Sequence, residues 1–258
     1  MPSEEPPEGL VAALRAAGCV FAEDEARQLV GAAEDEAALT RMLAERVAGT
    51  PLEQVVGYAE FAGLRIAVAP GVFVPRLRST LLVREAAAGV GAGDVAVDLC
   101  CGTGAIGAAL LEAVPGVEVY AADLDPAAVD CARRNLPADR VFAGDLYAAL
   151  PDRLRGRVAA LVANAPYVPT DAIATMPPEA RDHEHRVALD GGDDGLDVQR
   201  GVVAGAPDWL APGGRVLVET SRRQAPHTAR LMAAAGLLPR VVTDDDVDGT
   251  AVVGVRQV

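Results

Sequence analysis

The chain has 258 residues, of which 51% are hydrophobic and 23% are charged. This apolar fraction is enough for a buried core and excludes a wholly disordered chain. Acidic residues outnumber basic ones by 37 to 23, which gives a net charge of −14. Nucleic-acid-binding proteins neutralise phosphates with Lys and Arg, so this balance disfavours that class.

Membrane and secretion segments are not predicted. No apolar run reaches the roughly 18 residues of a membrane span, because Asp98 and Glu112 interrupt the best candidate. The first eight residues are acidic and rich in Pro, unlike the apolar segment of a signal peptide. We therefore expect a cytoplasmic protein, monomeric by default because no assembly motif is present.

A metal site is not predicted either. The chain has four Cys and three His, and no Cys pair has zinc-site spacing. Residues 182–185 read Asp-His-Glu-His, which we interpret as a solvated loop or, second, as a substrate contact. The adjacent Cys100 and Cys101 are interpreted as small buried residues rather than a redox pair.

The first 80 residues predict two small parts. Apolar residues at three- and four-residue spacings across 8–48 predict short helices, which Gly18, Gly31 and Gly49 terminate. Residues 1–49 are therefore predicted to form a helical accessory domain. Between Gly and Pro residues, the stretches 64–68 and 72–74 predict a β-hairpin, so residues 50–80 are predicted to be a hairpin linker.

Residues 81–258 alternate between strand and helix patterns, which predicts an α/β domain with a doubly wound parallel sheet. A short acidic turn joins the last two predicted strands as a hairpin, so one sheet edge is expected to be mixed. Residues 165–194 form a Pro-rich stretch too long for a plain connection, which predicts a functional loop. The seven predicted strands are 95–99, 117–122, 141–143, 158–163, 215–219, 240–243 and 250–256, and the predicted helices are 105–113, one beginning at Asp125-Pro126, 196–209 and 224–235.

A glycine loop follows the first strand of this domain. Residues 102–107 read Gly-Thr-Gly-Ala-Ile-Gly, a G-x-G-x-x-G pattern between strand and helix, and Asp123 follows about 20 residues later. An acid at that strand end can accept both ribose hydroxyls. The loop fits a dinucleotide or S-adenosylmethionine. A carboxylate at Asp98 would repel a pyrophosphate and attract a sulfonium or ammonium group, which favours S-adenosylmethionine.

The fourth strand delivers Asn-Ala-Pro-Tyr at 164–167 to the carboxyl edge of the sheet, where open α/β sheets bind ligands. An amide or exocyclic amine nitrogen is a poor nucleophile because its lone pair is delocalised. The Asn164 side-chain oxygen and the Ala165 carbonyl can accept hydrogen bonds from the N–H groups of that nitrogen and so orient its lone pair. Pro166 stiffens the loop and the Tyr167 ring can stack on a planar acceptor. The motif therefore predicts catalysis by orientation.

These motifs together resemble the class I S-adenosylmethionine-dependent methyltransferases, and within them the release-factor glutamine methyltransferases, over nearly the whole chain. Residues 51–57 with Phe61 and Gly63 are similar to the family's linker, and Val74-Pro75-Arg76 to its Ile-Pro-Arg segment. Residues 98–107 are similar to its cofactor loop, Gly144-Asp145 to its adenine-side pair, and 164–167 to its Asn-Pro-Pro-Tyr motif. The later matching stretches are 188–192, 195–197, 217–219 and Gln224.

The resemblance implies a Rossmann-like seven-stranded methyltransferase sheet and methylation of a side-chain amide in the Gly-Gly-Gln loop of a peptide chain release factor. The helical domain would help to hold this protein. Asn164 and Tyr167 would be catalytic, and no metal is implied. The implied donor-binding residues are Asp98, Cys100, Cys101, Gly102, Thr103, Gly104, Asp123, Leu124, Asp145, Leu146 and Asn164, and the implied acceptor-binding residues are Arg76, Asn164, Ala165, Pro166 and Tyr167.

The sequence also departs from the family pattern. Pro-Arg-Pro-Glu-Thr-Glu reads Pro-Arg-Leu-Arg-Ser-Thr at 75–80, the first Pro of the acceptor motif is Ala165, and the first Gly of the cofactor loop is Cys100. Three other functions therefore remain open: methylation of a small amine or amide metabolite, methylation of an adenine amine in nucleic acid, which the charge disfavours, and a non-catalytic binding module.

Overall fold

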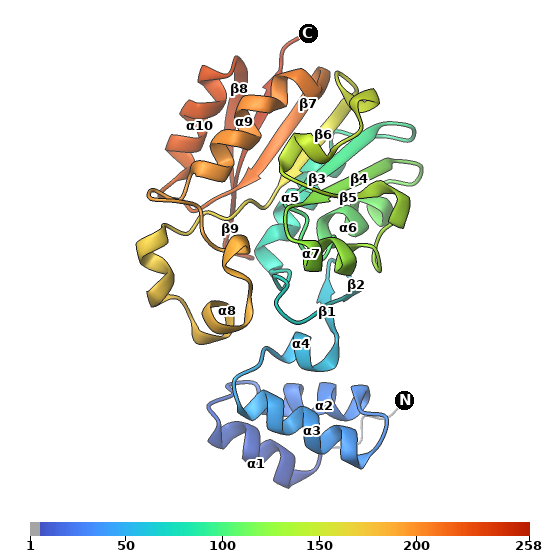
Figure 1. The fold of residues 1–258 in the computed structure, drawn as a ribbon, viewed down its shortest axis with the longest axis vertical. Coiled ribbons are helices and arrows are strands. Elements are labelled where there is room, and N and C mark those ends of the chain that lie inside the picture. The colour runs from blue at the N-terminus through green and yellow to red at the C-terminus, as the bar shows by residue number, and fades with distance from the viewer. Residues whose placement is uncertain (1–5) are drawn as a thin grey trace.

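The computed structural model describes residues 6–258. Figure 1 shows a helical bundle at the N-terminal end, a short hairpin beside it and a large sheet flanked by helices. The bundle consists of α1 (Glu8–Ala16), α2 (Ala22–Ala32) and α3 (Glu36–Val47). Leu14 and Leu29 are fully buried in a small core of its own, and the Asp35 side chain caps α3 by accepting from the Ala38 N–H.

The linker differs in part from its prediction. It begins with a short helix, α4 (Leu52–Val56), which was not predicted, and continues as an antiparallel pair, β1 (Tyr58–Phe61) and β2 (Leu64–Ala67). The strand predicted at 72–74 is wrong. The two-residue turn at Ala62-Gly63, both at positive φ, pairs β2 with the preceding strand instead.

Seven strands form the large sheet in the order β5-β4-β3-β6-β7-β9-β8. The first five are parallel, whereas β9 runs antiparallel to both β7 and β8. This confirms the doubly wound sheet with a mixed edge. The strands are β3 (Val95–Leu99), β4 (Glu118–Asp123), β5 (Val141–Ala143), β6 (Val158–Ala163), β7 (Leu210–Glu219), β8 (Leu237–Asp244) and β9 (Gly249–Arg256).

Helices cover both faces of this sheet, so β3 and β6 are buried on both sides (Figure 1). Leu81 and Leu110 pack on one face, and Trp209 packs on the other. Helix α5 was not predicted. The helices are α5 (Thr80–Ala87), α6 (Ala105–Ala113), α7 (Pro126–Ala132), α9 (Asp197–Trp209) and α10 (Ala225–Ala234). No helix within residues 6–258 is both long and apolar enough to cross a membrane.

The long segment predicted at 165–194 crosses the carboxyl edge of the sheet and reaches toward the bundle (Figure 1). It contains a short helix, α8 (Pro178–His183), and two 3-10 turns. Arg46 of α3 pairs with Glu179 of α8 at 2.8 Å, and the Gln54 amide donates to the His183 carbonyl at 3.1 Å. The segment therefore links the bundle to the sheet edge.

Candidate functional site

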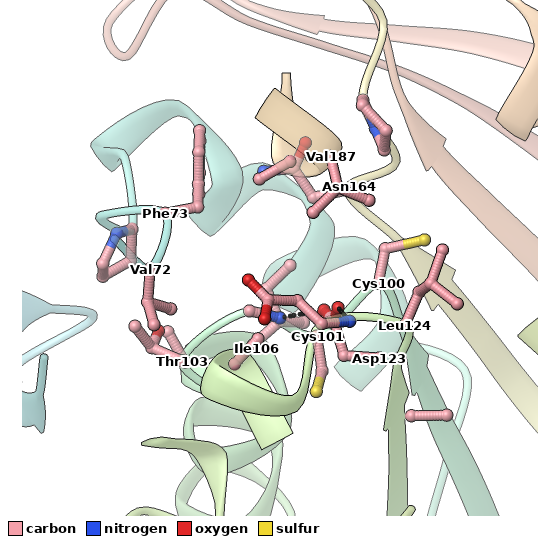
Figure 2. A pocket seen from close by; sticks show the side chains of 18 of the residues that line it. Val72, Phe73, Cys100, Cys101, Thr103, Ile106, Asp123, Leu124, Asn164 and Val187 are labelled. Carbon is pink, nitrogen blue, oxygen red and sulfur yellow. Dashed lines mark hydrogen bonds between the residues drawn. The ribbon is translucent and has the colours of Figure 1, made fainter. Parts of the chain in front are cut away.

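A pocket opens at the carboxyl edge of the sheet, where three neighbouring strands end. Leu99 of β3 lies opposite Ala122 of β4 and Ala163 of β6. The next residue of each strand, namely Cys100, Asp123 and Asn164, therefore emerges at the same level. All three line the pocket, and all three are labelled in Figure 2.

The glycine loop forms the floor of this pocket. Cys100, Gly102 and Gly104 all have positive φ, so the chain turns sharply before α6 begins. The Gly104 N–H donates to the Cys101 carbonyl at 2.7 Å. The φ of 75° at Gly104 would strain any other residue, and a Cβ there would also crowd Leu136 at 2.9 Å, so glycine is favoured. Cys100, Cys101, Gly102 and Thr103 line the pocket, whereas Gly104 does not.

Asp98 lies beneath the loop rather than on the pocket wall. It is 1% exposed, and its Oδ2 accepts from the Gly107 N–H at 3.0 Å. Burial raises the pKa of Asp98 to about 8, against the smaller opposing effect of that hydrogen bond. Its burial and its bond to the Gly107 N–H give Asp98 a role in supporting the loop, and its predicted contact with the donor stays a prediction.

Asp123 ends β4 and organises the backbone on both sides. Its Oδ2 accepts from the Gly102 N–H at 2.8 Å, and its Oδ1 accepts from the Asp125 N–H at 2.9 Å. Burial raises its pKa, and these backbone donors partly oppose the shift. Each carboxylate oxygen has a second lone pair for a ligand hydroxyl.

The remaining lining is mostly apolar. Leu124, Asp145 and Leu146 line the side beyond Asp123, and Leu146 adopts a positive φ of 44°. Figure 2 shows Phe73 and Val72 on the opposite side from Leu124, with Val187 above beside Asn164. The pocket carries no Arg, Lys or His among its lining residues, but three aspartates, Asp123, Asp125 and Asp145.

Asn164 occupies the side of the pocket formed by β6 and the start of α5. Its Nδ2 donates to Ser79 Oγ at 3.2 Å. Pro166 also lines the pocket, whereas Ala165 is fully buried behind it. The carboxamide oxygen of Asn164 is therefore the end left for a ligand N–H.

Tyr167 and Arg76 lie outside the pocket lining. The Tyr167 carbonyl accepts from Gln224 Nε2 at 3.0 Å, and burial, followed by Glu219, raises the pKa of the phenol. Arg76 pairs with buried Glu184 at 2.6 Å. Their predicted contacts with an acceptor stay predictions.

The two adjacent cysteines are poor nucleophiles, because burial raises the pKa of both Cys100 and Cys101 well above the ordinary thiol value. The ring Nδ1 of His185 lies 2.6 Å from Asp125 Oδ2. The backbone N–H of His185 donates to the Gly71 carbonyl. Within residues 6–258 no three His, Cys, Asp or Glu residues group as metal ligands.

Two residues of the site were missed by sequence reasoning. Ser79 belongs to the segment that departs from the family pattern, and the sequence assigns it no role. Asn135 belongs to no motif of the sequence, although its side chain joins the Thr103 carbonyl of the loop at 2.8 Å to the Ala67 backbone of β2 at 2.9 Å. The Ser79–Asn164 contact joins residues 85 positions apart, and the contacts of Asn135 join residues 32 and 68 positions apart. No local sequence pattern could therefore have indicated them.

Comparison with known proteins agrees with this geometry. Residues 64–179 match the family model of the methyltransferase small domain. The release factor glutamine methyltransferase of Streptomyces coelicolor is 42% identical over 198 residues, or 74% of this chain and 70% of that protein. The 4-amino-L-phenylalanine/4-methylamino-L-phenylalanine methyltransferase of Streptomyces pristinaespiralis is 36% identical over 200 residues, or 74% of this chain and 68% of that protein.

Among solved structures, a T. thermophilus 16S rRNA methyltransferase in complex with AdoMet and guanosine has a TM-score of 0.53 and 21% identity, covering 78% of this chain and 50% of that chain. This likeness shows a shared fold. The identity and coverage of the Streptomyces coelicolor relative show more: the chain is a methyltransferase that belongs to the release factor glutamine methyltransferase family.

Proposed function

We propose that this protein transfers a methyl group from S-adenosylmethionine to the side-chain amide nitrogen of a glutamine in a peptide chain release factor. The single observation that carries the proposal is the common level of Cys100, Asp123 and Asn164 at the sheet edge. This arrangement brings the glycine loop, which would bind a nucleoside, and the Asn164 carboxamide, whose oxygen can accept a hydrogen bond, into one pocket. A release factor acts in translation, so the proposal places the protein in the cytoplasm.

The pocket lining supports a cationic donor rather than a dinucleotide. A pyrophosphate needs cations or free backbone N–H groups, and here three aspartates line the pocket without an Arg, Lys or His. S-adenosylmethionine supplies a methyl group on a positively charged sulfonium. Negative potential in an apolar pocket favours such a ligand. The residues present therefore fit this donor.

Several residues would hold the donor. Asp123 is placed to accept the ribose hydroxyls with its second lone pairs. Leu124 and Leu146 would bracket the base, with Asp145 near its polar edge. The backbone from Cys100 to Thr103 would follow the chain that carries the sulfonium.

On the acceptor side, Asn164 does the orienting. Its Oδ1 would accept one N–H of the glutamine amide, because its Nδ2 is engaged by Ser79. An amide nitrogen becomes nucleophilic only when its lone pair turns out of conjugation, and a fixed acceptor can hold it in that orientation. Pro166 and the apolar side chains of Phe73 and Val187 would limit water around the reacting nitrogen.

A small aromatic amine is the second candidate acceptor. The Streptomyces pristinaespiralis relative is named for such a substrate, and an aryl amine also has a lone pair delocalised into a flat group. The Leu-Arg-Ser-Thr stretch at 77–80, which departs from the family pattern, lies at this wall of the pocket through Ser79. The same Asn164 contact would serve either acceptor.

The test uses labelled S-adenosylmethionine with the full-length protein, a release factor and 4-amino-L-phenylalanine as alternative acceptors. We expect mass spectrometry to find one added methyl group on a glutamine of the release factor. Asn164→Ala should retain donor affinity and lose about 10²–10³-fold in turnover, by analogy with removal of an oxyanion-hole group. Near-normal turnover of Asn164→Ala would contradict the mechanism, and label on the amine alone would favour the second acceptor.

A further inference from the structure

Ser79 is placed where the acceptor wall of the pocket meets the start of α5. It closes the 3-10 turn Leu77–Ser79 through its N–H to the Arg76 carbonyl at 3.0 Å. It is 2% exposed and lines the pocket. Its Oγ accepts from Asn164 Nδ2 at 3.2 Å, across 85 positions of sequence.

The hydroxyl of Ser79 does not serve as a helix cap. Serine at the N-cap of a helix normally turns its oxygen to a free N–H of the first turn. Ser79 instead has helical φ and ψ (−71° and −10°), because it belongs to the 3-10 turn that leads into α5, and its side chain makes no capping bond. Helix capping therefore does not account for the buried hydroxyl, whereas its contact with Asn164 does.

The contact matters because the two ends of a carboxamide are not equivalent. The oxygen end accepts an N–H, and the nitrogen end only donates. A half-turn of the Asn164 side chain would present a donor to the acceptor N–H group, and the two would repel. A partner for Nδ2 on the side away from the ligand stabilises the productive orientation.

From this geometry we propose that Ser79 is a positioning residue, which holds the Asn164 carboxamide with Oδ1 toward the methyl-accepting nitrogen. The proposal rests on the role of Asn164 in the proposed function. Ser79 acts through Asn164 and supplies no proton or electron pair to the reaction. Loss of the Ser79 hydroxyl should therefore lower the rate of methyl transfer once donor and acceptor are bound, and it should leave donor binding unchanged.

The experiment compares Ser79→Ala, Ser79→Thr and, as a matched control, Thr80→Ala. Thr80 is the next hydroxyl along the chain, and it bonds the Leu77 carbonyl at 2.7 Å without lining the pocket. Each full-length variant is assayed for kcat and KM with the acceptor that wild type methylates, for donor affinity by calorimetry, and for thermal midpoint. Loss of one neutral hydrogen bond predicts about a three- to tenfold fall in kcat for Ser79→Ala.

We expect Ser79→Thr to restore at least half of the wild-type kcat and Thr80→Ala to stay within twofold of it. Donor affinity should be the same in all three. The proposal is overturned if Ser79→Ala turns over as fast as Thr80→Ala. It is also overturned if donor affinity and thermal midpoint fall together with kcat, or if Ser79→Thr is as slow as Ser79→Ala at an unchanged midpoint.

The Asn164→Ala protein separates this proposal from the proposed function. If Asn164→Ala is fully active, the proposed role of Asn164 is wrong, and the proposed role of Ser79 is wrong with it. If Asn164→Ala is impaired while Ser79→Ala is not, only the Ser79 proposal fails. If both are impaired, the pair should not be additive, so adding Ser79→Ala to Asn164→Ala should slow the residual labelling by less than twofold.

Discussion

Asp98 is a carboxyl group that the fold keeps almost free of solvent. Its Oδ2 accepts from the Gly107 N–H, and its Oδ1 has no partner within residues 6–258. Its pKa rises from 3.8 to about 8 because burial disfavours the charged form. The folded state thus binds this proton more tightly than the unfolded state does. The resulting stability is fully present below about pH 4 and is lost as pH rises through about 8.

Asp98→Asn should remove this pH dependence. The asparagine oxygen can still accept from the Gly107 N–H, and the side chain cannot ionise. In the ligand-free protein we expect the free energy of unfolding of the variant to rise relative to that of wild type as pH rises from 5 to 8. The difference should grow by at most about 1.4 kcal/mol per pH unit. Urea unfolding at pH 5, 6.5 and 8 measures the difference. A difference that is the same at all three values would show that Asp98 is already ionised at pH 5.

At the scale of elements, the start of α5 is joined to the end of β7 by an ion pair. Arg78 Nε lies 3.1 Å from Glu219 Oε1, and the Glu219 side chain is 2% exposed. The other carboxylate oxygen of Glu219 has no partner among the described residues. Within residues 6–258, Arg78 is the cation that pairs with this buried acid at the end of the strand.

Arg78→Ala should destabilise the protein by about 2–3 kcal/mol, because it leaves Glu219 buried without its cation. The value lies below that for a fully buried pair, since 39% of the Arg78 side chain is exposed. Arg84→Ala is the matched control. Arg84 lies in the same region, is 59% exposed and pairs with Asp244 at 2.7 Å, so its loss should cost less than about 1 kcal/mol.

Chemical denaturation of both variants gives the comparison, and Glu219→Gln added to Arg78→Ala should recover most of the loss because it removes the uncompensated charge. Equal stabilities of Arg78→Ala and Arg84→Ala would mean that water reaches Glu219 once the arginine is gone.

The predicted elements were most accurate where burial and capping act locally. The predicted spans 95–99, 105–113, 141–143 and 158–163 match the structure. The strands at 95–99 and 158–163 are buried on both faces, so each is a nearly continuous apolar stretch between turn signals. The helix begun at Asp125 was correct because Asp125 caps it and Pro126 occupies its first turn. The hairpin was misassigned because its turn includes Ala62, which rarely adopts a positive φ.

The candidate site was predictable only for its loop and strand ends. Asp123 and Asn164 were identified because each directly follows a predicted strand of one parallel sheet, whereas Cys100 was identified only through the resemblance to the family's cofactor loop. Ser79 and Asn135 act through tertiary contacts, which no spacing encodes. The placement of Asp98 beneath the loop also depends on the packing of α6, so the sequence indicated an acid on the pocket wall where the structure has a buried acid bonded to the Gly107 N–H.

At the scale of the whole molecule, the bundle and the sheet have separate cores. Leu14, Leu29 and Val55 belong to a small cluster of the bundle, whereas the sheet has one large cluster on each face. Between them run the Arg46–Glu179 pair and the Gln54–His183 contact. Small units with few buried contacts open locally before the whole protein unfolds. We therefore expect amide hydrogens in α1–α3 to exchange faster than those in β3 and β6.

Hydrogen exchange of the full-length protein can then separate the two ligands. S-adenosylmethionine should slow exchange at residues 98–107, 123–125 and 185–190, since Val187 and Ala188 line the pocket, and should leave α1–α3 unchanged. A release factor added to the donor complex should slow exchange in α1–α3 as well, because the helical domain is predicted to hold the protein acceptor. A small amine should not, since it would reach only the pocket. If a release factor is methylated while exchange in α1–α3 stays as it was, the bundle does not contact the acceptor, and the sheet edge with the 165–194 segment must hold the protein alone.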